Sequence, residues 1–310
     1  MTSNEKIKII AIIGPTASGK TDTSLHLAEA LDGEIISCDS MQIYKGMDIG
    51  TAKPTKAEQR GIVHHLFDVV EPSESFSCAD YKILAEKALN DVISRGKTPI
   101  FCGGTGLYLD SVLGSGFSPS VPEGIRAELE KRDIDDLYDE LCKIDPESAL
   151  SIHKNNVKRV VRALEIYHGT GKTKSEWDRL SKLVQSKYDP LIIGLDYKDR
   201  QTLYNRINLR VDIMMKEGLL DEVKKVAPTL GYTASQAIGY KELVSYLNGN
   251  VTLEEAIELL KKNTRNYAKR QLTYFRRNAN VRWFYPDVMT SEEIFENIVN
   301  IASKHLKSAQ

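Results

Sequence analysis

The feature that most constrains the fold is a glycine-rich octapeptide that follows an apolar run at residues 7–13. It fits the pattern G-x-x-x-x-G-K-[ST], which has meaning only between a strand and a helix. Its glycines let backbone amides surround an anion, Lys20 reaches phosphate oxygens, and the Thr21 hydroxyl suits Mg²⁺. We therefore predict a phosphate or diphosphate cradle. Its residues are Gly14, Pro15, Thr16, Ala17, Ser18, Gly19, Lys20 and Thr21.

Strand and helix patterns alternate around this octapeptide. Residues 7–13 form a β-branched apolar run without alternation, which is typical of a strand covered on both faces in a parallel sheet. The other expected elements are helices at about 20–31 and 80–95 and strands at 34–38, 98–102 and 191–195. This order predicts an α/β fold with a P-loop NTPase-like parallel sheet and helices on both faces.

The segment at 121–188 has helical periodicity and no strand pattern. A chain of 310 residues also exceeds the length at which one compact core is comfortable. We therefore predict an α/β core formed by residues 1–120 and 189–310, with an all-helical domain inserted at 121–188. The core is expected to end in helices, including a long one opened by a capping box of Thr252 and Glu255.

Charge is distributed unevenly, although the net charge is only −1. Residues 123–147 carry ten acids against four bases, residues 154–182 carry eight Lys and Arg against three acids, and residues 261–282 carry eight and no acid. A chain that concentrates positive charge in two segments can bind a polyanion while staying neutral overall. Two solvated helix faces are the alternative interpretation.

The apolar run at 7–13 is too short for a membrane span or a secretory leader, and it contains Lys8. We expect a cytoplasmic protein without a membrane segment. The cysteines lack a C-x-x-C pair, which argues against a zinc ribbon and predicts reduced thiols. They are Cys38, Cys78, Cys102 and Cys142. No pattern predicts an obligatory protein partner.

The octapeptide leaves the reaction open. A kinase or ATPase usually ends another core strand with an Asp that holds Mg²⁺ through water. The expected strand at 98–102 ends instead in Gly103-Gly-Thr-Gly106, which argues against ATP hydrolysis. Asp68 could still serve this purpose, so a small-molecule kinase remains an alternative.

Further motifs follow in order along nearly the whole chain. They are Asp39-Ser-Met-Gln-Ile-Tyr44, Gly46-Met-Asp-Ile-Gly-Thr-Ala-Lys-Pro54, Gly103-Gly-Thr-Gly-Leu-Tyr108, Lys158-Arg-Val-Val-Arg162, Arg206 with Arg210, Gln236-Ala-Ile-Gly-Tyr-Lys-Glu242 and Tyr267-Ala-Lys-Arg-Gln-Leu-Thr-Tyr-Phe-Arg276. In these motifs the chain resembles the tRNA dimethylallyltransferase family, also called isopentenyl-tRNA transferases. It looks like the bacterial type, because it lacks the zinc-finger cysteines of eukaryotic members.

The resemblance implies transfer of dimethylallyl from dimethylallyl diphosphate to the exocyclic amine of the adenosine 3′ of the anticodon, with release of diphosphate. Asp39 matches the family's general base, and a carboxylate in reach can take the amine proton as the C–N bond forms. A turn cap or a contact to the Mg²⁺ shell is the alternative role. Ser40, Met41 and Gln42 match residues that contact the target base, which must be flipped out. Packing is the alternative for Met41, and Thr105 matches a tRNA contact.

Arg206 and Arg210 stand four apart on one predicted helix face. Guanidinium groups there could fork onto a diphosphate and neutralise it as it departs, and we favour Arg210 for this role. The alternative is an ion pair with Asp212 or Glu217.

Lys158, Arg159 and Arg162 share a predicted helix face. The face opposite consists of Val157, Val160, Val161 and Leu164. By resemblance the whole stretch, including Val160 and Val161, binds the anticodon stem-loop of tRNA. Arg126 is a weaker candidate, because the acids around it could pair with it.

Three other functions remain open. An enzyme that prenylates free AMP, ADP or ATP is disfavoured because a mononucleotide needs no extended basic surface. A kinase is the second alternative. The third, a non-catalytic RNA-binding protein, is disfavoured by the coexistence of Lys20, Thr21 and Asp39.

Overall fold

The computed structural model describes residues 6–114, 119–183 and 186–308. Contacts between Cα atoms divide the chain into two compact units. The first, here called the α/β unit, contains Met1–Val112 and Tyr188–Gln310, and the second, the helical unit, contains Leu113–Lys187. The first boundary thus falls earlier than the expected residue 121, and residues 115–118 between the two positions lie outside the described part.

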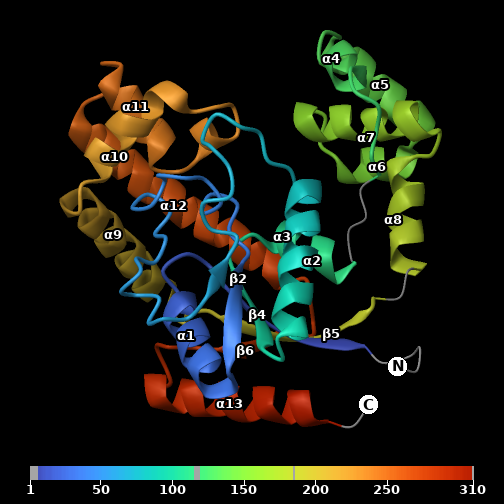
Figure 1. Ribbon diagram of the computed structural model, residues 1–310. Helices are drawn as coiled ribbons and strands as arrows, with labels where there is room; N and C mark the ends of the chain where they lie inside the picture. Colours follow the sequence, from blue (N-terminus) through green and yellow to red (C-terminus); the bar gives the residue numbers. More distant parts are fainter. Residues whose placement is uncertain (1–5, 115–118, 184–185, 309–310) are drawn as a thin grey trace. The chain divides into compact units, whose positions relative to one another are not determined.

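The α/β unit contains a six-stranded sheet with the order β3-β2-β4-β1-β5-β6, and every neighbouring pair is parallel (Figure 1). The strands are β1 Ile7–Ile13, β2 Gly33–Ser37, β3 His64–His65, β4 Thr98–Gly103, β5 Tyr188–Leu195 and β6 Arg282–Phe284. The predicted P-loop NTPase-like parallel sheet is confirmed. The sequence did not predict β3 and β6, which form its two edges.

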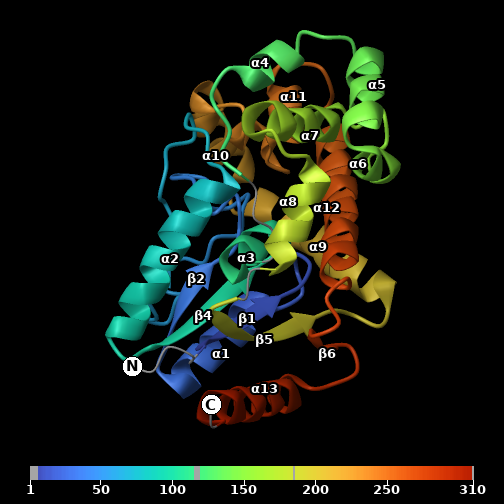
Figure 2. The same ribbon diagram turned by 90° about the vertical axis from the view of Figure 1, so that its right-hand side faces the viewer.

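Helices cover both faces of this sheet. Helix α1 (Lys20–Leu31) and helix α2 (Cys78–Ser94) lie on opposite sides of β2 in Figure 1. Helix α13 (Ser291–Lys307) packs beside α1, and both contribute to one apolar cluster with Ile10, Ile12 and Ile193 of the central strands (Figure 2). The C-terminal segment therefore completes a layer that the N-terminal βαβ unit begins.

The rest of the α/β unit is mainly helical. Its elements are α3 Gly106–Leu113, α9 Arg200–Lys216, α10 Leu219–Val226, η1 Ala227–Thr229, η2 Ala234–Gln236, α11 Tyr240–Leu247 and α12 Leu253–Phe275. The predicted capping box opens α12, because Thr252 and Glu255 exchange hydrogen bonds there. A second apolar cluster joins α10, α11 and α12 to Ile43, Tyr44 and Met47 of the loop after β2. None of the helices in the described ranges has the length and apolar content of a membrane span.

The described part of the helical unit contains five helices and no strand. They are α4 Ile125–Leu129, α5 Ile134–Ile144, α6 Pro146–Ser151, α7 Val157–Thr170 and α8 Lys174–Leu183. The core of the unit buries Val160 and Val161 of α7 completely or nearly so, at 0% and 1% exposure. Their side chains face the helix bundle, so a tRNA contact of this stretch, which stays a prediction, would come from its exposed residues. Val157, at the start of α7, is exposed rather than part of the apolar face.

Candidate active site

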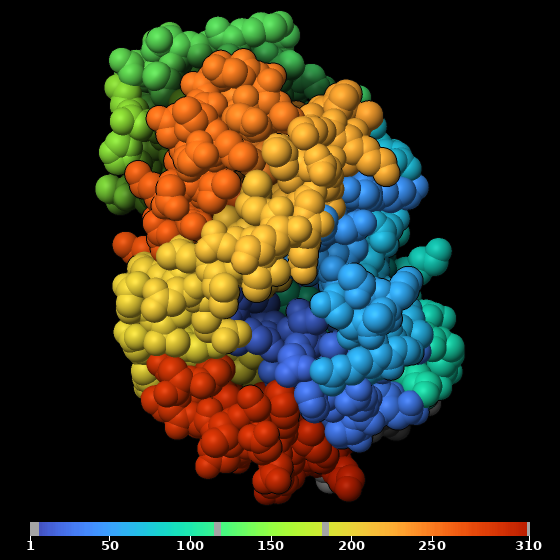
Figure 3. All heavy atoms as spheres, turned by 90° about the vertical axis from the view of Figure 1, so that its left-hand side faces the viewer, coloured from blue at the N-terminus to red at the C-terminus, as the bar shows by residue number. Residues whose placement is uncertain are grey.

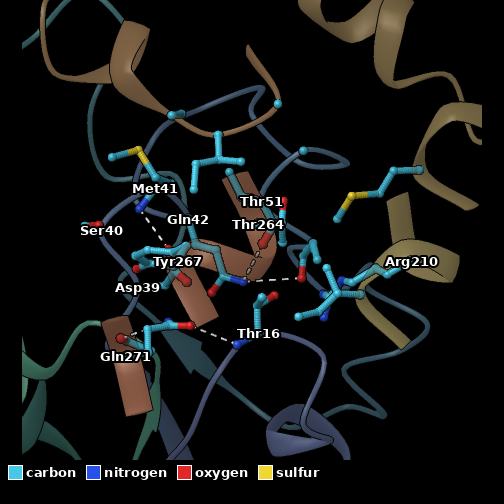
Figure 4. Close-up of a pocket in the computed structure, with 18 of the residues that line it drawn as sticks. Thr16, Asp39, Ser40, Met41, Gln42, Thr51, Arg210, Thr264, Tyr267 and Gln271 are labelled. Carbon is cyan, nitrogen blue, oxygen red and sulfur yellow. Dashed lines mark hydrogen bonds between the residues drawn. The ribbon is translucent and has the colours of Figure 1, made fainter. Parts of the chain in front are cut away.

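A cavity of about 280 Å³ in the α/β unit lies where three parallel strands end. Parallel strands bring their carboxyl ends to one sheet edge, so residues far apart in sequence meet there. Thr16, Lys20 and Thr21 follow β1, and residues 39–42 follow β2. Figure 4 shows Asp39 and Tyr267 on one wall of the cavity and Arg210 on the other. The structure thus brings together the predicted cradle and the predicted base.

The octapeptide is folded as an anion cradle. Gly14 is required there, because an added Cβ would lie 2.4 Å from the Leu195 carbonyl oxygen. Gly19 has a φ of 93° and precedes α1, whose first turn receives no side-chain cap, so its amides are open to a ligand. The Ser18 hydroxyl is buried and has no hydrogen-bond partner within the described residues. A buried orphan oxygen in such a loop fits a ligand that supplies the missing partner.

Lys20 lies over the cradle, and its Nζ donates to the Pro15 carbonyl oxygen at 2.6 Å. Burial lowers the pKa of Lys20 to about 8, and the positive charge of Arg210 acts in the same direction, whereas Cys102 and Asp39 oppose it. The ammonium form is therefore held less firmly than in an exposed lysine. An anionic ligand would restore it.

Asp39 is half-buried at the cavity wall, and its Oδ1 accepts a hydrogen bond from the Met41 amide at 2.9 Å. Burial raises the pKa of Asp39 above its ordinary value, while the Met41 amide and the charges of Lys20 and Arg210 act to lower it. A carboxylate with a raised pKa is a better proton acceptor near neutral pH. Asp39 therefore caps its own turn and is also suited to act as a base.

Arg206 and Arg210 project from α9 towards the cradle. Arg206 Nε donates to the Ala17 carbonyl oxygen at 3.0 Å. Both arginines line a second hollow, of about 800 Å³, on the outer side of residues 17–21. Figure 3 shows this hollow between the blue N-terminal segment and the yellow α9. Lys20, Thr21 and Arg210 line both spaces.

The alternative role of these arginines, an ion pair within α9, is wrong for Asp212, which pairs with Lys261 at 2.8 Å. Within the described ranges, no carboxylate lies at ion-pair distance from either guanidinium. Burial lowers the pKa of Arg210, and nearby Asp39 opposes this shift. Arg210 is therefore a partly buried positive group for which an anionic ligand is a suitable partner.

Comparison with known proteins identifies the family. A sequence model of the family described as IPP transferase matches residues 42–278, and one described as isopentenyl transferase matches residues 7–71. The tRNA dimethylallyltransferase of Anoxybacillus flavithermus is 52% identical over 94% of this chain and 94% of its own length. That of Bacillus subtilis is 48% identical over 96% and 98%. The chain belongs to the IPP transferase family.

Solved structures of the family have the same fold. The tRNA isopentenylpyrophosphate transferase of Bacillus halodurans is 48% identical, covers 97% of each chain and superposes with a TM-score of 0.74. A eukaryotic dimethylallyltransferase acting on tRNA is 30% identical, covers 98% of this chain and 87% of its own, and gives a TM-score of 0.81. The bacterial relatives agree with the predicted bacterial type.

The residues predicted to contact the target base differ in their availability within this IPP transferase family member. The side-chain Nε2 of Gln42 donates to the carbonyl oxygens of Thr51 and Ala52, at 3.2 and 3.3 Å, and its Oε1 accepts from Ser37 Oγ at 3.1 Å. The Gln42 side chain therefore supports the neighbouring loop. To hydrogen-bond an adenine it would have to give up these bonds. Met41 packs against the second apolar cluster, which is the packing role left open for it.

Thr105 does not line the cavity. Its hydroxyl accepts a hydrogen bond from the Ser40 amide at 3.1 Å, and its own amide donates to the Cys38 carbonyl oxygen at 2.9 Å. Thr105 thus joins the end of β4 to the turn that carries Asp39. Contact with tRNA remains a prediction for Ser40 and Thr105.

The predicted basic RNA surface of the helical unit divides into two parts. Arg126 and Arg162 both bind the buried carboxylate of Glu165, at 3.1 and 2.8 Å. Arg126 thus has the acidic partners left open for it, Glu130 of its own segment at 3.9 Å and Glu165 of α7. Lys158 and Arg159 are exposed.

Sequence reasoning missed the contribution of α12 to the cavity. Thr264, Tyr267 and Gln271 line it, and their spacings of three and four place them on one helix face. Gln271 Oε1 accepts from the Thr16 amide at 2.9 Å, and its Nε2 donates to the Gly104 carbonyl oxygen at 3.0 Å. The sequence signal that could have revealed this contribution is the spacing of Thr264, Tyr267 and Gln271, which places three polar groups on one face of the helix.

Proposed function

We propose that this chain transfers the dimethylallyl group of dimethylallyl diphosphate to N6 of the adenosine 3′ of the anticodon in tRNA, with release of diphosphate. The observation that carries the proposal is the single cavity, which joins a phosphate cradle to the Asp39 carboxylate. Relatives that match nearly the whole chain are named tRNA dimethylallyltransferases. The chain is a prenyltransferase.

The diphosphate of the donor would lie on the cradle. Backbone amides of residues 17–21, which include the first turn of α1, supply donors, and Lys20, Arg206 and Arg210 supply positive charge. As the bond between the prenyl carbon and the diphosphate oxygen breaks, negative charge grows on the leaving group. Pre-positioned cations stabilise that charge more than they stabilise the ground state, which raises the rate.

Mg²⁺ fits this site as a partner of the diphosphate. The described residues contain no cluster of three or more His, Cys, Asp or Glu that could hold a metal by themselves. Mg²⁺ commonly keeps several waters and binds through few protein ligands and substrate phosphates, and the Thr21 hydroxyl lines both hollows. When bound, the ion would neutralise part of the diphosphate charge.

Asp39 would accept the proton of the adenine amine. The amine nitrogen forms the C–N bond to the prenyl carbon, its proton passes to the carboxylate, and diphosphate leaves with the bonding electrons. Asp39 is half-buried at the wall of the cavity, so the target adenosine must leave its stack to reach it. A tRNA loop presents bases that can be flipped in this way.

Kinase chemistry has no support at Asp68. This residue lines neither hollow, and its Oδ1 pairs with Lys53 at 2.6 Å. An RNA substrate, in contrast, suits the exposed Lys158 and Arg159 and the basic α12. We accordingly expect the protein to act in the cytoplasm on the anticodon stem-loop.

The proposal is tested with labelled dimethylallyl diphosphate incubated with total tRNA, with AMP and with neither. Label should appear in tRNA alone and require Mg²⁺. Label in AMP would favour an adenylate isopentenyltransferase, and ATP turnover without prenyl transfer would favour a kinase.

A further inference from the structure

The loop after β2 forms a wall shared by the two hollows. Gly50, Thr51 and Ala52 line the cavity, whereas Asp48 and Ile49 line the second hollow together with Ala52. Ala52 has a φ of 51°, in the left-handed region that disfavours residues with a side chain. A wall in such a conformation persists only where its surroundings hold it.

Glu222 of α10 holds this wall from behind. Its Oε2 accepts hydrogen bonds from the amides of Asp48 and Ile49 at 2.9 and 2.8 Å, and its Oε1 accepts one from the amide of Gly50 at 3.0 Å. Three consecutive amides therefore converge on one carboxylate. Successive amides of this kind form a concave anion-binding nest, which Glu222 fills from within the protein.

Tyr240 of α11 completes the support. Its hydroxyl donates to Glu222 Oε1 at 2.6 Å. Its ring lies so close to Gly50 that an added Cβ would meet Tyr240 Cε2 at 2.5 Å. The Glu222 carboxylate holds the amides of residues 48–50, and the Tyr240 ring packs against the backbone of Gly50. Movement of this loop away from the cavity is therefore restricted.

Neither Glu222 nor Tyr240 lines either hollow. We propose that Glu222 is a positioning residue for prenyl transfer, whose carboxylate holds the amides of residues 48–50 so that the Gly50–Ala52 wall keeps the donor against the cradle. This inference rests on the proposed function. Displacement of a reacting group by about 1 Å can cost on the order of 10²-fold in rate, so a loosened wall should weaken donor use.

The test replaces Glu222 by Ala and, separately, by Gln. Glu222→Gln keeps the side-chain shape but turns an NH₂ group towards amide donors. The matched control is Asp221→Ala, because Asp221 is the next residue of α10, is exposed and pairs only with Lys224 among the described residues. Donor KM, kcat and tRNA affinity are measured for each variant, together with Tm and binding of dimethylallyl diphosphate to the free protein.

We expect Glu222→Ala to raise the donor KM by roughly tenfold or more, with tRNA affinity close to that of the unaltered chain, and Asp221→Ala to change neither. Glu222→Ala leaves an empty nest that a small carboxylate fits. Millimolar formate should therefore restore part of the donor affinity in Glu222→Ala at constant ionic strength, and chloride should not.

A donor KM within about twofold of the unaltered chain in both Glu222 variants would overturn the inference. So would a loss that formate does not relieve while Tm falls, because that pattern marks general destabilisation. If Glu222→Ala does not fold, the donor KM of Glu222→Gln decides. Absence of transfer by the unaltered chain would instead reject the proposed function, and donor binding to the free protein would still test the wall.

Discussion

Two pairs of arginines in this chain have opposite surroundings. In the α/β unit, Arg206 and Arg210 face the cradle, and no carboxylate of the described residues pairs with them. In the helical unit, Arg126 and Arg162 converge on the buried carboxylate of Glu165. Partial burial of a cation without a protein partner, as at Arg210, costs free energy unless a ligand supplies the anion, whereas a cation paired with a carboxylate is compensated within the fold.

Protonation equilibria show the same contrast. Burial lowers the pKa of Arg210 and the pKa of Lys20, so the protein surroundings disfavour these two positive charges. In the helical unit, burial acts to raise the pKa of Glu165, but the hydrogen bonds from Arg126 and Arg162 outweigh it and lower that pKa. A bound anion would favour the charged forms of Lys20 and Arg210, whereas the helical unit supplies the Glu165 carboxylate to its own arginines.

The largest effect is expected at the carboxylate of the cavity. Asp39→Asn keeps the size and the turn hydrogen bond but removes the proton acceptor. General-base assistance is worth roughly 10² to 10⁴ in rate, so the single-turnover transfer step should fall within that range. Affinities for tRNA and donor should change little. Quench-flow measurement with saturating substrates provides the rate.

A supporting role of Asp39 in the Mg²⁺ shell would produce a different result. Raising Mg²⁺ would then recover much of the rate, and the loss would appear as weaker diphosphate affinity. Recovery by Mg²⁺, or a rate loss below about tenfold, would contradict the base assignment.

The next prediction compares the effects on activity and stability of replacing one arginine from each pair. Arg210→Gln should lower kcat/KM for the donor by roughly 10² to 10³, as loss of a charge-stabilising donor commonly does. Its Tm should stay near that of the unaltered chain. Arg162→Gln should leave Glu165 with one arginine and lower the free energy of unfolding by about 1–3 kcal/mol. Transfer at saturating tRNA should remain close to normal.

Denaturant titration and donor kinetics on the two variants give both readouts. The assignment of a catalytic role to Arg210 and a structural role to Arg162 would be contradicted if Arg210→Gln chiefly lowered stability. It would also be contradicted if Arg162→Gln slowed transfer at saturating tRNA and donor.

The central fold was predictable because buried parallel strands have short runs of consecutive apolar residues, which β1, β4 and β5 contain, and β2 has the apolar pair Ile35–Ile36. The edge strands were not. His64–His65 has two polar residues, and Arg282–Phe284 is three residues long and begins with an exposed arginine. Such segments become strands only because a neighbouring strand offers backbone partners.

Site residues were predictable where they belong to the glycine-rich octapeptide, as Lys20 does, or directly follow a predicted strand, as Asp39 does. Gln271 could not be placed, because its contacts with the Thr16 amide and the Gly104 carbonyl depend on how α12 packs across 255 and 167 residues of chain. The pairing of Arg126 with Glu165 spans 39 residues. Local periodicity reveals which face a residue occupies, and tertiary packing decides its partner.

A smaller effect concerns pH. The pKa of Lys20 is about 8 without ligand, and a diphosphate favours the charged form and so raises it. Below pH 8 the lysine is already charged and donor affinity should be flat. Above pH 8 binding must take up a proton, so Kd should rise by up to about tenfold per pH unit. Calorimetry in buffers of different ionisation heat measures this uptake. Lys20→Ala should bind weakly, show no such pH dependence and keep its tRNA affinity.

The smallest effect tests the two exposed bases Lys158 and Arg159 of the helical unit. If Lys158 and Arg159 meet RNA phosphates, replacing both by Ala should weaken tRNA binding for all sequences alike. It should also flatten the slope of log K against log salt by roughly 0.7 to 0.9 per lost contact. The charge-matched control replaces Lys131 and Lys143, which belong to the acid-rich segment 123–147 of the same unit.

Both double variants change the net charge equally, so a general electrostatic effect would move them together. Only direct phosphate contacts separate their slopes, because counterions are released where a cation meets the backbone. An anticodon minihelix should show the same separation as whole tRNA. Equal slopes in the two variants would leave Lys158 and Arg159 as solvated residues, and the helical unit would then need another surface to bind the polyanion.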